Sequence, residues 1–318
     1  MKIAFFGTPE FAWEILSWIL DYPEINCVLV VSQPDKPVGR KKDFQATPVK
    51  HVALDAGIEV LQPEKIKKNI DFHAYLRSLN LDFIVVVAYG KIIPQAILDI
   101  PKYGCINIHG SILPKYRGAS PVQAAVKSWD TQTWLTTMYM SAGMDEWDIL
   151  KIAKIDIDKV DSSVDIFWKF IQIWPDLLRN TLNEIISWTL VSVPQYHADA
   201  THCGKISRED GEVNFYSQNS QEIYNTFRAY KPWPWIYTYF QWKRLVLEEV
   251  SLEENNNDLS IEWNIWDFVK ILKNTYWIIC ADKEILEIQQ VKLEGKKSMD
   301  IQSFVNGNKQ ILDYNFNK

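Results

Sequence analysis

The stretch Phe83-Ile84-Val85-Val86-Val87-Ala88 decides the fold that the sequence predicts. Every side chain in it is apolar, so both faces of this strand must be covered, as in the centre of a parallel sheet. Shorter segments of strand character are predicted at 3–6, 27–31, 60–61 and 104–109. Helical patterns lie between them, and the alternation of strands with helices indicates a doubly wound, Rossmann-like α/β domain.

The chain changes character at about residue 190. The helical pattern of 164–187 ends there, and residues 191–206 show no periodicity. Short alternating segments separated by polar turns follow, which predicts a small C-terminal β-barrel of OB-like type. The expected organisation is a catalytic domain at 1–190, a linker at 191–206 and a β-barrel domain at 207–318.

The composition is typical of a soluble globular protein, with 47% hydrophobic and 23% charged residues. A formal net charge of −6 gives no sign of a general nucleic-acid binder, so any nucleic-acid contact must be local. The four cysteines have no metal-ligand spacing, and we expect no metal. The chain has no signal-peptide pattern and no apolar run that could span a bilayer, which favours a cytoplasmic protein without a membrane partner.

Tryptophan is abnormally frequent and stands where turns are expected. The chain has 14 tryptophans and 12 glycines, whereas roughly 22 glycines are usual for this length. We hypothesise that most of the tryptophans are glycine in the native protein because its gene reads UGA as glycine; the alternative is a genuinely Trp-rich chain. Peptide mass spectrometry of the native protein distinguishes the two. The positions chiefly concerned are Trp13, Trp129, Trp134, Trp147, Trp235 and Trp242.

Polar side chains end the strand predicted at 104–109. Because apolar and polar residues alternate there, Asn107 and His109 should project from one face. They stand at the carboxyl end of a strand, where open α/β sheets bind ligands, and a carboxylate, Asp145, follows later. An amide, an imidazole and a carboxylate suit acyl transfer to an amine, since two donors can hold an oxyanion while the carboxylate orients the imidazole. A polar strand end with a hydrogen-bonded histidine is the alternative that these residues alone leave open.

Longer motifs carry a resemblance to a known family. They are Gly7-Thr-Pro-Glu-Phe11, Gln33-Pro-Asp-Lys-Pro37, Asn107-Ile-His-Gly-Ser-Ile-Leu-Pro-Lys-Tyr-Arg-Gly-Ala-Ser-Pro121, Asp145-Glu-Trp-Asp148 and Arg228-Ala-Tyr-Lys-Pro-Trp-Pro-Trp235. Taken in this order, the sequence resembles the methionyl-tRNA formyltransferases. The Asn-x-His and Asp pattern alone marks only the broader formyltetrahydrofolate-using superfamily, whereas the early basic loop and the C-terminal domain narrow the resemblance to the tRNA enzymes.

The resemblance implies an enzyme that moves the formyl group of 10-formyltetrahydrofolate to the amino group of methionine on initiator tRNA, for translation initiation. Asn107 and protonated His109 would stabilise the tetrahedral oxyanion. Asp145 would orient and charge His109, with a water relaying protons. The residues implied to line the folate site are Ser111, Ile112, Leu113, Pro114, Ala88, Tyr89 and Gly90. The implied partners are the folate co-substrate and initiator methionyl-tRNA, and the family precedent is a monomer.

A basic loop carries four cations within seven residues. They are Lys36, Arg40, Lys41 and Lys42. In the resembled family such a loop reaches the acceptor end of tRNA, and flexible Lys and Arg side chains suit phosphate contacts that weaken with salt. A solvated charged loop is the alternative. The C-terminal domain has more acidic than basic residues, so it does not predict a broad positive groove.

Two other classes of function stay open from sequence. The first is a related folate enzyme, such as a glycinamide ribonucleotide or sugar-amine formyltransferase or a formyltetrahydrofolate hydrolase; these would lack the basic loop, the C-terminal domain or both. The second is a non-catalytic tRNA- or folate-binding protein, which an indole at Trp147 beside Asp145 would favour. A nicotinamide dinucleotide is excluded, because the first turn, 7–12, is not GxGxxG.

Overall fold

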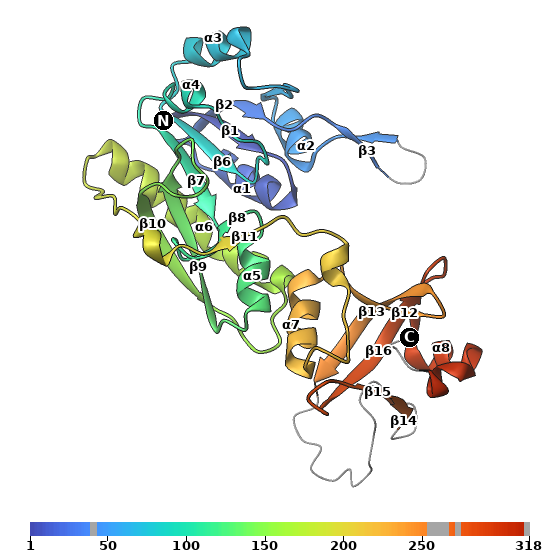
Figure 1. Cartoon of the computed structure of the whole chain (residues 1–318). Helices are drawn as coiled ribbons and strands as arrows, with labels where there is room; N and C mark the ends of the chain where they lie inside the picture. The colour runs from blue at the N-terminus through green and yellow to red at the C-terminus, as the bar shows by residue number, and fades with distance from the viewer. Residues whose placement is uncertain (39–42, 253–266, 271–274, 315–318) are drawn as a thin grey trace. The chain divides into compact units, whose positions relative to one another are not determined.

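The computed structural model describes residues 1–38, 43–252, 267–270 and 275–314 (Figure 1). The chain divides into two units. The first comprises 1–121, 132–156 and 167–203, and the second comprises 122–131, 157–166 and 204–318. Within the described residues no helix is long and apolar enough to cross a membrane.

A seven-stranded sheet forms the centre of the first unit, in the order β10-β9-β7-β6-β1-β2-β5. The strands are β1 (Lys2–Gly7), β2 (Asn26–Val31), β5 (Glu59–Leu61), β6 (Phe83–Val87), β7 (Cys105–His109), β9 (Gln132–Tyr139) and β10 (Ile149–Asp156). The first five of these pair in parallel, while β9 and β10 are antiparallel. All five side chains of β6 are buried, as its continuous apolar run predicts.

Helices cover both faces of this sheet. They are α1 (Glu10–Leu20), α2 (Pro48–Asp55), α3 (Ile70–Ser78), α4 (Gln95–Leu98) and α6 (Ser163–Ile186). Phe6 of β1 and Val86 of β6 share one core with Phe72 of α3 and Ile97 of α4. On another helix pair, the ring of Phe11 in α1 lies 5.3 Å from that of Phe167 at the start of α6. The doubly wound, Rossmann-like α/β fold is thereby confirmed.

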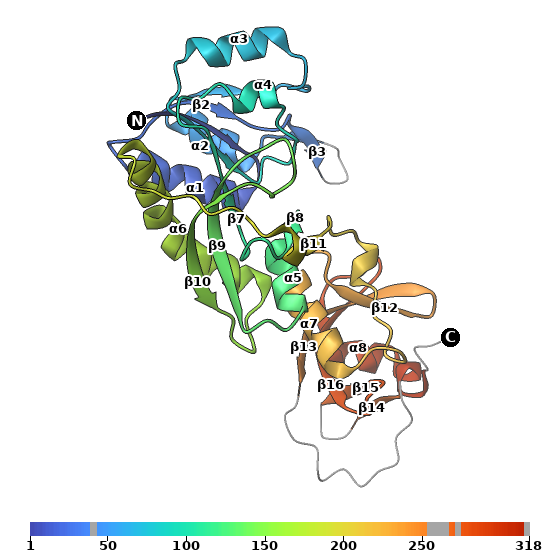
Figure 2. The ribbon, with the colours of Figure 1, turned by 60° about the vertical axis from the view of Figure 1, so that its left-hand side comes forward.

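The segment expected to be a linker belongs to the first unit up to Cys203. Val193 exchanges backbone hydrogen bonds with Ile149, the first residue of β10. Strand β11 (His202–Cys203) pairs in parallel with β8 (Arg117–Gly118), and Figure 2 shows the two side by side. These pairings place Val193 beside the start of β10 and residues 202–203 beside β8, in the segment that follows β7.

The second unit is built on an antiparallel sheet in the order β12-β13-β16-β15-β14, with β17 paired to β16. Its strands are β12 (Ile236–Phe240), β13 (Lys243–Leu252), β14 (Phe268–Lys270), β15 (Tyr276–Ile279), β16 (Ile285–Leu293) and β17 (Met299–Asp300). Helices α7 (Ser220–Tyr230) and α8 (Ile301–Gly307) contribute Phe227 and Phe304 to its core. The antiparallel domain agrees with the sequence prediction; a pairing that closes a barrel is not among those of the described strands.

Four tryptophans adopt the left-handed backbone that favours glycine. Their φ angles are 60° at Trp129, 59° at Trp188, 65° at Trp235 and 64° at Trp242. Such angles are uncommon for bulky side chains and cost nothing steric for glycine.

Two of these positions end helices. Trp129 follows α5 (Pro121–Lys127), and its backbone N–H donates to Val126 while that of Asp130 donates to Ala125. Trp188 follows α6 in the same way. Its backbone N–H donates to the Ile185 carbonyl, and the N–H of Thr189 donates to the Glu184 carbonyl. Both patterns are Schellman motifs with tryptophan at the position that glycine usually occupies.

A third position closes a hairpin. Gln241 and Trp242 form the two-residue turn between β12 and β13, with φ of 49° and 64°. A two-residue turn with both φ angles positive is typical of Asn-Gly or Asp-Gly. The backbone therefore supports the glycine hypothesis at Trp129, Trp235 and Trp242, adds Trp188 to it, and is silent at Trp13, Trp134 and Trp147, which lie outside the positive-φ set.

Candidate active site

Strand β7 presents Asn107 and His109 at the carboxyl edge of the sheet. Ile106 precedes Asn107 and Ile108 stands between the two polar residues; both isoleucines are buried in the core, as the alternation predicts. The Asn107 side-chain amide donates to the Val86 carbonyl at 3.2 Å, which fixes it against β6. Its Oδ1 is buried and has no hydrogen-bond partner in the described structure. Because buried polar atoms are normally paired, this oxygen marks a place for a ligand or a water.

His109 is 5% exposed and faces an acceptor at each ring nitrogen. Its Nε2 lies 3.0 Å from the Tyr116 carbonyl oxygen, and its Nδ1 lies 3.8 Å from Oδ2 of Asp145. A carbonyl can only accept, so Nε2 carries the hydrogen of that bond. A ring that also carries a hydrogen toward the carboxylate is the imidazolium, the form that can both donate and compensate negative charge.

Asp145 is held in an unusual conformation beside His109. Its φ is +53°, a left-handed angle that aspartate tolerates better than most residues. The same Oδ2 that faces His109 accepts the backbone N–H of Gly118 at 2.8 Å. The Asp145 side chain is 17% exposed, so only a small part of it meets solvent. An observed departure of this kind, next to two candidate catalytic groups, is typical of a functional site.

At position 118 the backbone lies so close to the carbonyl oxygen of Cys203 that only glycine fits. The φ of Gly118 is +123°, and a Cβ built on it would lie 2.0 Å from the carbonyl oxygen of Cys203 in β11. Pairing of β8 with β11 thus requires glycine here. The consequence is a fixed backbone donor aimed at Asp145.

A buried arginine and a glutamine hold the Asp145 loop from the other side. Arg117 is 4% exposed, and its Nε and Nη2 donate to Oε1 of Gln195 at 3.1 and 2.7 Å. Gln195 in turn donates from Nε2 to the Asp145 carbonyl at 3.0 Å and to the Trp147 carbonyl at 2.6 Å. The sequence analysis missed both residues as site components. Arg117 lies inside a quoted motif, but Gln195 lies in a stretch without any pattern.

Comparison with known proteins gives the family. Residues 1–178 match the family described as formyl transferase, and residues 205–309 match its C-terminal domain. The chain is 38% identical over 309 residues to a methionyl-tRNA formyltransferase of Caldicellulosiruptor saccharolyticus, with 97% of each chain covered. It is 39% identical over 308 residues to that of Acidobacterium capsulatum, again with 97% of each covered. The chain belongs to the methionyl-tRNA formyltransferase family.

Solved structures agree on the fold. A methionyl-tRNA formyltransferase from Clostridium thermocellum superposes with a TM-score of 0.56 at 17% identity, covering 80% of this chain and 95% of that one. WlaRD, a sugar 3N-formyl transferase, superposes with a TM-score of 0.64 at 18% identity, covering 93% of this chain and 99% of that one. The shared architecture therefore serves different acceptors, and the family assignment rests on the full-length sequence relatives.

The loop expected to line the folate site in this family leaves β7 at once. Ser111 is fully buried; its hydroxyl donates to the Lys115 carbonyl at 2.6 Å, and its own carbonyl accepts from Thr136 at 2.6 Å. Leu113 is buried, while Ile112 and Pro114 are half-buried. The loop is thus pinned at Ser111, and Ile112 and Pro114 keep apolar surface for a ligand.

In the turn expected to contact the pterin, residues 88–90, some polar groups already have hydrogen-bond partners within the protein. Ala88 and Gly90 have φ of 46° and 77° and are exposed. The Tyr89 carbonyl already accepts from Thr8 at 3.1 Å and Gln33 at 2.9 Å, so it is occupied. Burial raises the pKa of Tyr89 to about 12, and its hydroxyl has no partner in the described structure. Backbone groups of Ala88 and Gly90 remain as the ones a ligand could use.

The basic loop is seen only at its two ends. Lys36 begins β3 (Lys36–Val38), which pairs with β4 (Asp43–Gln45). Arg40, Lys41 and Lys42 lie outside the described residues. The hairpin that frames the loop was not predicted from the sequence.

The described part of the chain carries His, Cys, Asp and Glu side chains that are possible metal ligands, and the burial of its thiols bears on their reactivity. No group of three or more His, Cys, Asp or Glu side chains is placed there to hold a metal ion. Burial raises the pKa of the Cys27 thiol to about 12 and raises those of Cys105 and Cys280 as well. Thiols with raised pKa values in apolar surroundings are poor nucleophiles.

Proposed function

We propose that this chain transfers the formyl group of 10-formyltetrahydrofolate to the amino group of methionine on initiator tRNA. The observation that carries the proposal is the constellation at the carboxyl edge of the sheet. Asn107 and His109 share one strand, and His109 Nδ1 faces Asp145 at 3.8 Å. These three groups occur in a chain that matches methionyl-tRNA formyltransferases over 97% of its length.

The chemistry assigned to these residues is stabilisation of a tetrahedral intermediate. The neutral methionyl amine attacks the formyl carbon, the carbonyl oxygen becomes an oxyanion, and the bond to the folate nitrogen then breaks as that nitrogen takes up a proton. Asn107 donates a hydrogen bond to the oxyanion, and protonated His109 donates a second through Nε2–H, which exchanges the Tyr116 carbonyl for the oxyanion. Asp145, itself fixed by the Gly118 N–H, orients His109 and balances its charge. A water in the partly open site relays protons from the amine to the leaving nitrogen.

The fit of a folate rests on what the pocket residues leave unsatisfied. The buried Oδ1 of Asn107 has no partner among the described residues, and Ile112 and Pro114 are only half-buried. A pterin has donors and acceptors along one edge and two flat faces. The exposed backbone of Ala88 and Gly90 could pair with that edge, while the half-buried apolar residues would contact a face.

For the tRNA, we propose that Lys36, Arg40, Lys41 and Lys42 contact phosphates of the acceptor end. In a chain with a net charge of −6, four cations in seven residues form a local exception that suits a polyanion. The affinity of such contacts falls as salt rises, because bound counterions are released. Formylation at limiting tRNA should therefore weaken with salt more than formylation at saturating tRNA.

The test is formyl transfer from 10-formyltetrahydrofolate to charged initiator methionyl-tRNA, with glycinamide ribonucleotide as the competing acceptor. We expect product on the tRNA alone. His109→Ala should lower kcat at least about 10²-fold, since it removes an oxyanion donor. His51→Ala, an exposed histidine of α2, is the matched control and should leave kcat unchanged. Product on glycinamide ribonucleotide, or equal activity of the two variants, would contradict the proposal.

A further inference from the structure

Thr201 stands directly before β11 and holds the loop that leaves β7 through three hydrogen bonds. Its hydroxyl oxygen accepts the backbone N–H of Tyr116 at 2.8 Å. Its backbone carbonyl accepts the N–H of Arg117 at 2.8 Å, and its own N–H donates to the Pro114 carbonyl at 3.3 Å. Because Thr201 is exposed, its side chain adds little to an apolar core, and its contribution to the fold is these contacts.

Tyr116, the residue held by the Thr201 hydroxyl, has a strained backbone. Its φ is +57°, in the left-handed region, which is uncommon for a bulky side chain. Such a residue persists where its surroundings over-determine its conformation. At the other end of Tyr116, the Cys203 thiol lies 3.4 Å from the carbonyl oxygen, and burial raises the pKa of this thiol, so it keeps a hydrogen that it can donate. Residues 201–203 therefore hold both the N–H and the carbonyl of Tyr116.

The carbonyl of Tyr116 is the acceptor that Nε2 of His109 faces at 3.0 Å. If Tyr116 relaxed to an ordinary backbone angle, this carbonyl would turn away from the imidazole. A neutral ring would then place its hydrogen on Nδ1, toward the carboxylate of Asp145 at 3.8 Å. The carbonyl in its present place keeps a hydrogen on Nε2, the nitrogen assigned to the oxyanion.

We propose that Thr201 is a positioning residue for formyl transfer, which acts on His109 through the carbonyl of Tyr116. The inference rests on the proposed function, because it concerns the donor that His109 presents to the oxyanion. The hydroxyl holds Tyr116 in its strained conformation, and the Tyr116 carbonyl then sets the tautomer and the direction of the imidazole. Gln195 holds the carbonyl of Asp145 from the same segment, so residues 195–201 support both neighbours of the His109 ring.

Thr201→Val and Thr201→Ser form a matched pair, because valine has the shape of threonine without the hydroxyl, whereas serine keeps the hydroxyl. One neutral hydrogen bond corresponds to about a 2- to 10-fold change in rate. In the formylation assay we therefore expect Thr201→Val to lower kcat about 2- to 10-fold and to leave both KM values within about twofold of wild type. Thr201→Ser should restore kcat. Each rate is measured well below the melting temperature of the variant, so that loss of folded protein does not contribute.

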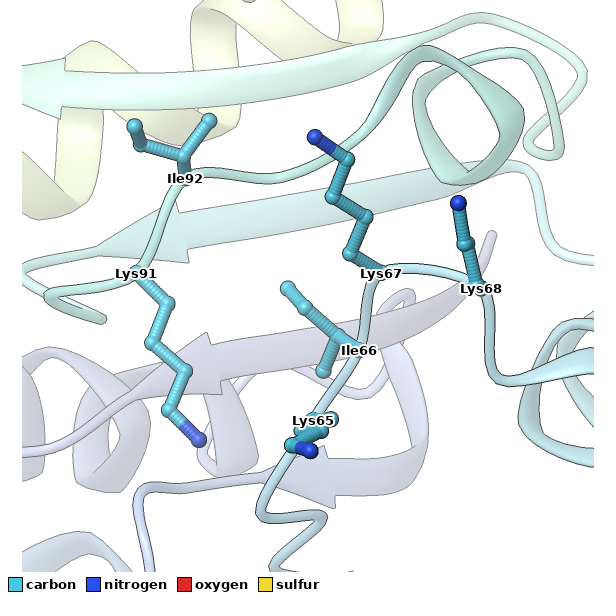
Figure 3. Close-up of a pocket in the computed structure, with 6 residues that line it drawn as sticks. All are labelled: Lys65, Ile66, Lys67, Lys68, Lys91 and Ile92. Carbon is cyan, nitrogen blue, oxygen red and sulfur yellow. The ribbon is translucent and has the colours of Figure 1, made fainter.

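The control is Thr189→Val, which should keep the wild-type kcat. Thr189 is an exposed threonine after α6, and its hydroxyl lies 2.9 Å from that of Ser187. A cavity of about 500 Å³ between the loops that follow β5 and β6 is lined by other residues (Figure 3). Neither threonine belongs to that lining, so the comparison reports on the contact with Tyr116.

NMR of protein with isotope-labelled histidine supplies a readout that a purely structural role would not change. The chain has five histidines, and the spectrum of His109→Ala identifies the signal of His109. At alkaline pH, where the ring is neutral, we expect wild-type His109 to carry its hydrogen on Nε2. In Thr201→Val a measurable fraction should move to Nδ1, and Thr201→Ser should return the hydrogen to Nε2.

Three results would overturn the proposal: an unchanged kcat in Thr201→Val, a His109 tautomer that Thr201→Val leaves unchanged, or a Thr201→Ser variant that restores neither. A lower melting temperature with an unchanged tautomer would make Thr201 a residue of the fold only. Failure of the proposed function is separate. In that case wild-type protein would form no formylmethionyl-tRNA, while the tautomer of His109 would still respond to Thr201→Val.

Discussion

Replacing Trp188 and Trp242 together by glycine should make the protein more stable. Both residues have a left-handed backbone, with φ of 59° and 64°, and both are well exposed, at 85% and 88%. A side chain in that conformation costs about 1–2 kcal/mol. Glycine avoids this cost, but it loses more conformational entropy on folding than tryptophan does, which offsets about 0.5–1 kcal/mol of the gain.

The net gain is therefore about 0.5–1 kcal/mol at each position. Little burial is lost in exchange, because both indoles are mostly in solvent. The two residues lie in different units and share no partner, so their effects should add to about 1–2 kcal/mol. Chemical denaturation of wild type and variant, followed by circular dichroism, measures this difference as a shift of the midpoint at constant slope.

The matched control replaces Trp18 and Trp168 by glycine. These indoles are also exposed, at 43% and 57%, but they lie within α1 and α6. Glycine inside a helix should cost about 0.5 kcal/mol relative to tryptophan. Equal loss of stability in both pairs would refute the backbone argument. Mass spectrometry of the native protein tests the recoding hypothesis separately, since tryptophan found at 188 and 242 would end it.

Three further changes test the site and its support. Asp145→Asn should keep the fold, because asparagine also tolerates φ of +53° and accepts the same N–H, but should lower kcat about 10²-fold or more in the formylation assay; near wild-type turnover would rule out its role. Gly118→Ala places a Cβ 2.0 Å from a carbonyl oxygen and should lower both expression and thermal stability, so a normal melting temperature would disprove the close approach. Hydrogen bonds from Lys50 and Gln62 lower the pKa of Asp35, which therefore stabilises the fold above its unfolded pKa of about 3.9 and loses that contribution as pH falls through its lower folded value. Lys50→Gln should flatten this acid-side dependence in denaturation measured between pH 5 and pH 2, and an unchanged slope would contradict it.

Elements with a continuous or alternating apolar pattern were predictable from the sequence. The buried run of β6 and the alternation of β7 each appear where they were expected. The hairpin β9–β10 was not predicted, because β9 buries three threonines, Thr133, Thr136 and Thr137. Thr136 and Thr137 satisfy their hydroxyls through hydrogen bonds with Ser111 and Thr181, so polar residues stand at core positions that periodicity alone assigns to apolar ones.

Helix α7 shows a related limit. Asn225 and Arg228 are buried on it, at 4% and 2%, and Arg228 donates to the Asp161 carbonyl at 2.7 Å as well as to Asn225 at 3.0 Å. From the sequence pattern alone, an arginine is predicted to lie at the surface, so the burial of Arg228 could not be predicted. Asp161 lies 67 residues away in the sequence, and only the fold brings it to Arg228.

The candidate site divides along the same line. Asn107 and His109 could be predicted as site residues from the sequence, because two polar residues at a strand end interrupt an apolar pattern. Gln195 has no such signal: it lies in an aperiodic stretch and contacts the site through two backbone carbonyls, which carry no sequence information. Gln195→Ala would take the side-chain donor from those two carbonyls and would leave the buried Arg117 with one partner fewer, since its Nη2 still meets Nδ1 of His197 at 3.1 Å; the loss costs about 2–4 kcal/mol. Because the Asp145 backbone would lose its anchor, kcat should fall further than stability explains, whereas Gln195→Glu, which still accepts from Arg117, should restore stability before it restores kcat. Equal recovery of both in the Glu variant would mean that the residue supports the fold and not the reaction.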